Sequence, residues 1–155
     1  MSCPAPWLVS GRRVAIVALT LFIGGCSPTN PSYVANVPFS SIDVVTGTGT
    51  EALVGKVLAV DYAGYLYNAS QPENKGTLFD TSINTNVISF QLGAGDVIRG
   101  WDDGLVGMRI GGQRRLTIPP DLGYGSSGRG PIPPNATLVF DVWLLGVFEP
   151  GEAPQ

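Results

Sequence analysis

The chain has 155 residues, 44% of them hydrophobic, and a formal net charge of -3. This length suits one compact domain with a short appendage, and without a basic cluster a nucleic-acid-binding surface is not expected. Because the sequence contains no histidine and both cysteines, Cys3 and Cys26, lie near its N-terminus, it excludes Ser-His-Asp and Cys-His catalysis and a histidine-ligated zinc site, and we expect no metal or cofactor.

The first 25 residues have the pattern of a bacterial lipoprotein signal peptide. Arg12 and Arg13 precede an uncharged apolar run at residues 14–23, which is shorter than the ~20 residues of a membrane-spanning helix. The next residues, Ile23-Gly24-Gly25-Cys26, are similar to a lipobox, where a peptidase cuts before a cysteine that carries diacylglycerol. We therefore predict that residues 1–25 are removed and that a lipid on Cys26 anchors an exported protein to a bacterial envelope membrane. An uncleaved N-terminal anchor is the alternative.

The rest of the chain divides into a tether, one domain and a short tail. Residues 26–36 are polar and proline-containing, as in a tether. The predicted domain spans residues 37–149, and residues 150–155 form the tail. Branched and aromatic residues predict strands at residues 41–46, 54–67, 87–92, 113–118 and 137–148, and the polar residues 68–77 predict a loop.

Only residues 96–105 indicate a helix. Val97, Trp101 and Leu105 are spaced by four, and Asp96 suits the N-cap position. Two glycines within this segment predict that the helix is short. Five or so antiparallel strands with one short helix make an α+β domain.

Five blocks occur in an order that is typical of one protein family. They are VDYAG (60–64), LFDTS (78–82), GDVIRGWDDGL (95–105), GGQRRLTIP (111–119), and Tyr124-Gly125 followed by IPPNATLVFDV (132–142). Over about residues 54–148 the chain thereby resembles the FKBP-type peptidyl-prolyl cis–trans isomerases. The resemblance implies an α+β fold in which a curved antiparallel sheet of five to six strands wraps around one short helix, with an apolar pocket between them.

The resemblance also implies the roles of the pocket residues. Trp101 would form the floor against which a proline ring packs, while the Ile98 N–H and the Tyr124 hydroxyl would bind substrate carbonyl groups. Asp80 would lie at the edge, hydrogen-bonded to neighbouring side chains. The implied catalytic set is Tyr62, Phe79, Asp80, Ile98, Trp101, Tyr124 and Phe140. Further substrate-binding positions are Ile88, Phe90, Val97 and Ile132.

These residue types suit amide rotation on physical grounds. The bond before proline must twist through a state without amide resonance, and the barrier is ~18–20 kcal/mol. The twisted amide is less polar than the planar one, so an apolar pocket with aromatic walls favours it. Such a site requires no nucleophile, metal or proton shuttle.

Other interpretations stay open at this point. Trp101 and the phenylalanines suit an ordinary core, Asp80 suits a turn, and the adjacent Asp102 and Asp103 suit a solvated helix face better than paired acid–base chemistry. The functional alternative is a lipid-anchored peptide-binding or chaperone module with little isomerase activity. In both cases, isomerase or binding module, we expect a monomer that binds proline-containing polypeptides. The resemblance also implies macrolides such as tacrolimus or rapamycin as ligands.

Three departures from the family bear on its ligands. The loop 65–77 is longer than in the smallest members, Ile88 stands where a pocket aromatic is common, and Arg129 and Pro131 lie at the expected pocket rim. These departures leave the substrate preference and the macrolide affinity open.

Overall fold

The computed structural model describes residues 37–152. The predicted signal peptide (1–25), Cys26 and the tether (26–36) lie outside this range, as do residues 153–155. Within it, no helix has the length and apolar character needed to cross a membrane.

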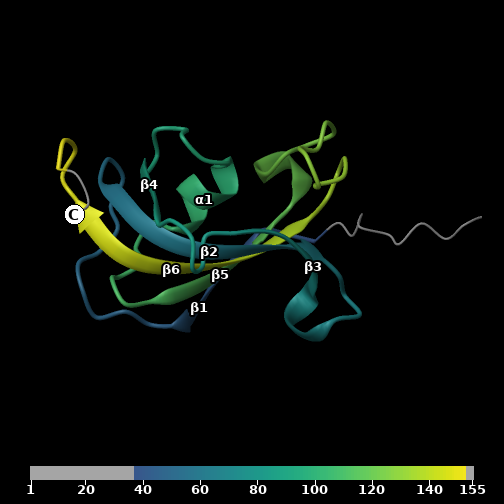
Figure 1. The fold of residues 1–155 in the computed structure, drawn as a ribbon, viewed down its shortest axis with the longest axis horizontal. Coiled ribbons are helices and arrows are strands. Elements are labelled where there is room, and N and C mark those ends of the chain that lie inside the picture. Colours follow the sequence, from purple (N-terminus) through teal and green to yellow (C-terminus); the bar gives the residue numbers. More distant parts are fainter. Residues whose placement is uncertain (1–36, 153–155) are drawn as a thin grey trace, which may run out of the picture. The chain divides into compact units, whose positions relative to one another are not determined.

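One antiparallel sheet organises the described domain. Its strands are β1 (Ser40–Val45), β2 (Val57–Tyr67), β3 (Lys75–Thr81), β4 (Ile88–Gln91), β5 (Gln113–Ile118) and β6 (Leu138–Phe148). They follow the order β1-β5-β6-β2-β3, and β4 also pairs with β2. The helix α1 (Arg99–Gly104) lies against one face of this sheet, over β2 and β6 in Figure 1. The predicted α+β fold with five to six strands and one short helix is confirmed.

The core forms between α1 and the sheet. From the sheet, fully buried side chains include Leu58, Val60, Leu116, Ile118, Leu138 and Val142. The helix contributes Trp101, and Leu105 follows directly after it. A Cβ atom on Gly100 would lie 2.6 Å from Ile118, and one on Gly104 would lie 2.8 Å from Leu116. The two glycines that predicted a short helix therefore also allow that helix to approach β5 closely.

Three predicted boundaries were wrong. β2 begins at Val57 rather than at residue 54, because the Lys56 N–H donates to Leu53 O in a turn. β3 begins at Lys75, inside the predicted loop 68–77, which also contains a 3-10 turn (Pro72–Asn74).

The helix begins at Arg99, with Ile98 at the N-cap. Asp96 does not cap it, because its carboxylate accepts a hydrogen bond from the Gln91 N–H instead. A second 3-10 turn spans Pro120–Leu122.

Polar side chains hold both sides of α1. Asp102 accepts hydrogen bonds from the N–H groups of Gly93 (2.8 Å) and Gly95 (3.1 Å). Arg114 is 9% exposed, pairs with Asp43, and donates to the carbonyls of Gly104 and Val106. Asp103 is exposed, as predicted for a solvated helix face, whereas the half-buried Asp102 also ties the preceding loop to the helix through its carboxylate.

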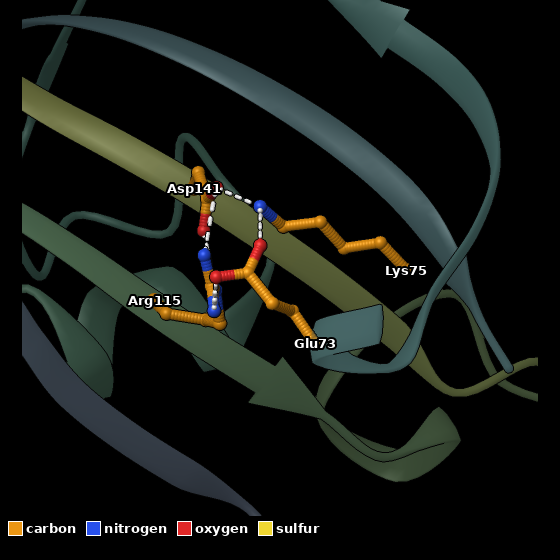
Figure 2. Close-up of polar contacts among 4 residues, drawn as sticks. All are labelled: Glu73, Lys75, Arg115 and Asp141. Carbon is orange, nitrogen blue, oxygen red and sulfur yellow. Dashed lines mark hydrogen bonds and ion pairs between the residues drawn. The ribbon is translucent and has the colours of Figure 1, made fainter. Parts of the chain in front are cut away.

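A second polar cluster lies on the sheet face away from α1. Successive β6 residues point to opposite faces, so Asp141 points away from the core that contains Phe140. Asp141 is 3% exposed and pairs with Arg115 of β5 (2.7 Å) and Lys75 of β3 (2.5 Å). Glu73 bridges the same two cations, at 2.9 Å from Arg115 and 2.7 Å from Lys75 (Figure 2). The four residues form a closed ionic network that joins the long loop and β3 to the centre of the sheet.

The network matters most for β3. Among the strands of residues 37–152, this edge strand pairs only with β2, and the register shifts twice, between Gly64 and Tyr65 and between Tyr65 and Tyr67. Such irregularities remove ladder hydrogen bonds. The contacts of Lys75 with Asp141 therefore supplement an interrupted ladder.

Protonation equilibria reflect the same contacts. Hydrogen bonds from Lys75 and Arg115 lower the pKa of Glu73 from 4.5 to about 2. Burial opposes the charge on Lys75, but hydrogen bonds to Asp141 and Glu73 outweigh it and raise the Lys75 pKa. Because the folded-state pKa of Glu73 is depressed, its contribution to stability is present above about pH 4.5 and is lost as the pH falls towards 2. Glu73 is 52% exposed, which keeps that contribution small.

We predict that Lys75→Met lowers the free energy of unfolding by about 1–3 kcal/mol, because it leaves the buried Asp141 with one cationic partner. The measurement is urea unfolding at neutral pH. Arg109→Met is the matched control, since Arg109 pairs with Glu51 at the surface and such pairs contribute about 0.2–1 kcal/mol. Equal losses in the two variants would contradict a structural role for the network.

Candidate functional site

An open cavity of about 420 Å³ lies between α1, the sheet and the segment around Tyr124. Its lining combines aromatic, aliphatic and a few polar residues: Tyr62, Phe79, Asp80, Ile88, Gly95, Asp96, Val97, Ile98, Trp101, Tyr124, Arg129 and Phe140. A second cavity of about 440 Å³ shares Phe79, Asp80, Tyr124 and Arg129 and adds Gly130, Pro131 and Ile132.

Four aromatic rings pack edge-on beside the first cavity. The ring centroid of Phe140 on β6 lies 5.3 Å from that of Trp101 and 5.6 Å from that of Phe79. In both pairs the two ring planes are nearly perpendicular. Tyr62 of β2 lies 5.3 Å from Trp101 in a similar arrangement. Such edge-to-face geometry is favourable for aromatic pairs. The rings therefore hold one another in fixed orientations around an apolar floor.

Gly64 makes this packing possible. It sits on β2 opposite Phe140 in the strand register. A Cβ atom there would lie 2.7 Å from the rings of both Phe140 and Phe79. A side chain at position 64 would thus push the two phenylalanines apart.

The polar groups at the cavity fall into two kinds. Asp80 is engaged, because it accepts hydrogen bonds from the Tyr62 hydroxyl (2.6 Å) and the Thr81 N–H (2.9 Å). In contrast, the Ile98 N–H and the Tyr124 hydroxyl have no hydrogen-bond partner among residues 37–152. Ile98 has extended backbone angles at the start of α1, and its own carbonyl accepts the Trp101 N–H. Two unused hydrogen-bond donors therefore lie beside an aromatic floor.

Two features of Trp101 define that floor. The residue is 4% exposed, so most of its indole packs inside the domain. Its Nε1–H is buried and, within the described range, has no hydrogen-bond partner. Packing alone therefore orients the indole, which forms an apolar part of the cavity wall.

The structure brings most of the predicted site residues together. All seven predicted catalytic residues line the first cavity, as do Ile88 and Val97. Ile132 lines the second cavity. Phe90 lines neither of them. Its ring is buried on β4 and packs against Trp101 at 5.7 Å, so it supports the floor from within the core.

Sequence reasoning missed two lining residues and gave a third little weight. Gly95 and Asp96 line the cavity because the loop before α1 turns towards it, and Asp96 had been interpreted only as a helix cap. Arg129 was placed at the rim but received no role. Its position after a run of small residues was the available signal.

The described residues contain no group of three or more His, Cys, Asp or Glu side chains that could hold a metal ion. What they do provide is an apolar, ring-sized surface flanked by free donors. Such a site can hold a non-polar ring against Trp101 while donating hydrogen bonds to neighbouring carbonyl groups.

Comparisons with known proteins agree on one family. Residues 49–145 match the family of FKBP-type peptidyl-prolyl cis-trans isomerases. An FK506-binding protein of Neisseria meningitidis is 48% identical over 109 residues, covering 69% of this chain and 94% of that protein. The peptidyl-prolyl cis-trans isomerase FKBP15-3 of Arabidopsis thaliana is 48% identical over 99 residues, covering 64% and 65%. The crystal structure of FkpA from Escherichia coli aligns with a TM-score of 0.61 at 38% identity, covering 72% of this chain and 48% of that chain.

We predict that Tyr62 ionises only well above the usual pH range of a phenol, since burial and then the hydrogen bond and charge of Asp80 raise its pKa. Asp80→Asn should lower the Tyr62 pKa towards ~10, which NMR of ring-labelled tyrosine can follow. Because the folded-state pKa is raised, the stability that Tyr62 contributes is present below pH ~10 and is lost at higher pH. Tyr62→Phe assigns the signal, and an unchanged Tyr62 pKa in Asp80→Asn would contradict the coupling.

Proposed function

The chain belongs to the FKBP-type peptidyl-prolyl cis-trans isomerases, and we propose that it isomerises X-Pro bonds of exported or cell-envelope proteins in the cavity above Trp101. The observation that carries this proposal is the pairing of an aromatic floor with the free Ile98 N–H and Tyr124 hydroxyl. Assistance to folding in the envelope follows from the predicted export signal.

In the proposed complex, the proline ring packs on Trp101, with Tyr62 and Phe140 beside it. The Ile98 N–H and the Tyr124 hydroxyl donate hydrogen bonds to substrate carbonyl groups near the proline. These contacts hold the chain while the X-Pro bond rotates. An apolar environment is less unfavourable for the twisted amide than for the planar one, so the barrier to rotation falls.

Asp80 acts at the edge of the same cavity. Its carboxylate accepts the Tyr62 hydroxyl and the Thr81 N–H. Those bonds orient the Tyr62 ring, which in turn packs against Trp101. We assign Asp80 to orientation and to the local electric field, without transfer of a proton.

Macrolide binding is part of the proposal. The relatives named FK506-binding proteins make tacrolimus or rapamycin reasonable ligands for this cavity. Ile88 in place of an aromatic, and the rim formed by Arg129 and Pro131, are expected to weaken that binding relative to the smallest family members.

We predict a nearly flat pH–rate profile between about pH 6 and 8. No histidine is present, and ordinary carboxyl and phenol groups titrate near ~3.9 and ~10, so no group needs to change its charge in this range. Exchange NMR of residues 27–155 with X-Pro peptides measures binding and turnover separately. Tight binding without turnover would instead support the peptide-binding alternative.

The same assay distinguishes the site residues. Asp80→Leu should lower turnover while the domain stays folded. Tyr124→Phe should have a milder effect, since it removes one hydrogen bond that contributes ~0.5–1.5 kcal/mol. Trp101→Ala should weaken binding the most, because it empties the floor, and part of the loss should come from a core destabilised by ~3–5 kcal/mol. A steep profile with a pKa near 7, or full activity in both Asp80→Leu and Trp101→Ala, would falsify this mechanism.

We predict that Cys26 carries a lipid and that residues 1–25 are absent from the mature protein. Two acyl chains should give stable membrane attachment, whereas one chain gives marginal binding. In a bacterial host, the native protein should fractionate with membranes, and Cys26→Ser should abolish lipoprotein processing. Intact mass spectrometry is the measurement, and a membrane-extracted protein that retains Met1 and an unmodified Cys26 contradicts the prediction.

A further inference from the structure

One positive charge in the described domain differs from all the others. Residues 37–152 contain seven lysine and arginine side chains. Six of them pair with a carboxylate: Lys56, Lys75, Arg99, Arg109, Arg114 and Arg115. Within this range, Arg129 has no carboxylate partner. Its charge is therefore available to a ligand.

Arg129 lies at the part of the surface that the two cavities share. It lines both cavities. Its guanidinium group lies over the Tyr124 ring, 5.9 Å from the centroid, which is a cation–π distance. The cation therefore lies beside the aromatic residue whose hydroxyl is free to bind substrate.

The backbone that carries Arg129 is held in place. The Arg129 N–H donates to Ile132 O at 3.0 Å, and the Ile132 N–H donates back to Arg129 O at 2.9 Å. Gly128 and Gly130 on either side adopt positive φ angles of 64° and 53°, which favour glycine. This tight turn fixes the point from which the guanidinium group reaches over the cavity.

Two carboxylates, Asp80 and Asp96, line the first cavity together with Arg129, and Asp80 also lines the second. Asp80 is occupied by Tyr62 and Thr81, and Asp96 accepts a hydrogen bond from Gln91. Neither forms an ion pair with Arg129. The planar guanidinium group suits a substrate carboxylate in the second cavity, because its N–H groups can donate two parallel hydrogen bonds to one carboxylate.

We infer that Arg129 is a specificity-determining residue that favours substrates with aspartate or glutamate immediately next to the proline. This inference rests on the proposed isomerase function and names the substrate class of the same site. Arg129 is exposed, so the preference for glutamate over glutamine should be about 1.5- to 5-fold, as for other exposed ion pairs. Salt near 1 M, where the screening length is about 3 Å, should reduce it.

The experiment uses two series of X-Pro peptides with the native protein and three variants. In one series the residue before proline is glutamate, glutamine or lysine, and in the other the residue after proline varies in the same way. Exchange NMR gives kcat/KM, and titration of tryptophan fluorescence gives Kd. Arg129→Gln removes the charge, Arg129→Glu reverses it, and Arg109→Gln removes an equal charge from a residue that lines neither cavity.

The native protein should prefer glutamate to glutamine in at least one of the two peptide series. Arg109→Gln should keep this preference and Arg129→Gln should lose it. Arg129→Glu should prefer lysine instead. Equal values for glutamate and glutamine in both series, or a preference that persists in Arg129→Gln, overturn the inference. If the native protein binds peptides but accelerates none of them, the proposed function fails. In that case the ratio of Kd values still decides the role of Arg129.

Discussion

The close contact between α1 and β5 is the constraint on which the cavity depends. The helix lies so close to Ile118 and Leu116 that positions 100 and 104 have no room for a side chain larger than that of glycine. Trp101 projects from the same short helix into the core, where Tyr62, Phe140 and Phe90 contact its ring. A methyl side chain at either glycine position would push the helix outward and so draw the indole away from these rings. The helix also needs its polar attachments, because a segment of six residues is too short to be stable by itself.

Polar and apolar interactions are separated in this domain. Asp102 and Arg114 bind backbone groups at the two sides of α1, and the ionic network around Asp141 lies on the opposite face of the sheet. Buried charges of this kind are tolerated when they are paired and hydrogen-bonded. The space above Trp101 is lined by aromatic surface, by two donors that have no partner among the described residues, and by the hydrogen-bonded carboxylates of Asp80 and Asp96. This arrangement suits the proposed binding of a proline ring flanked by carbonyl groups.

Much of the architecture could be predicted from the sequence, and the exceptions have physical reasons. β5 and β6 are rich in branched and aromatic residues, and the predictions for them were correct to within one residue. The start of β3 was missed because its ladder is interrupted and because its ion pair with Asp141, far away in the sequence, helps to hold it.

The start of α1 and the role of Asp102 depend on the turn at residues 93–95, which neither propensity nor spacing reveals. The cavity residues came from the family resemblance, since periodicity alone cannot distinguish Trp101 from ordinary core. The resemblance also placed Phe90 among the substrate-binding positions, whereas its ring lines neither cavity and supports the floor from the core side.

The strand order has a mechanical consequence for a tethered protein. The chain enters the sheet at β1, on one edge, whereas Phe79 and Asp80 belong to β3 on the other. Neighbouring strands are about 4.8 Å apart, so the four steps from β1 to β3 span roughly 19 Å. In the proposed lipoprotein, tension on a tether ahead of β1 would load the β1–β5 pair first and reach Phe79 and Asp80 only through the longest ladder, between β2 and β6. If the proposed anchor and function are correct, a client chain engages the β3 edge while the β1 edge bears the load.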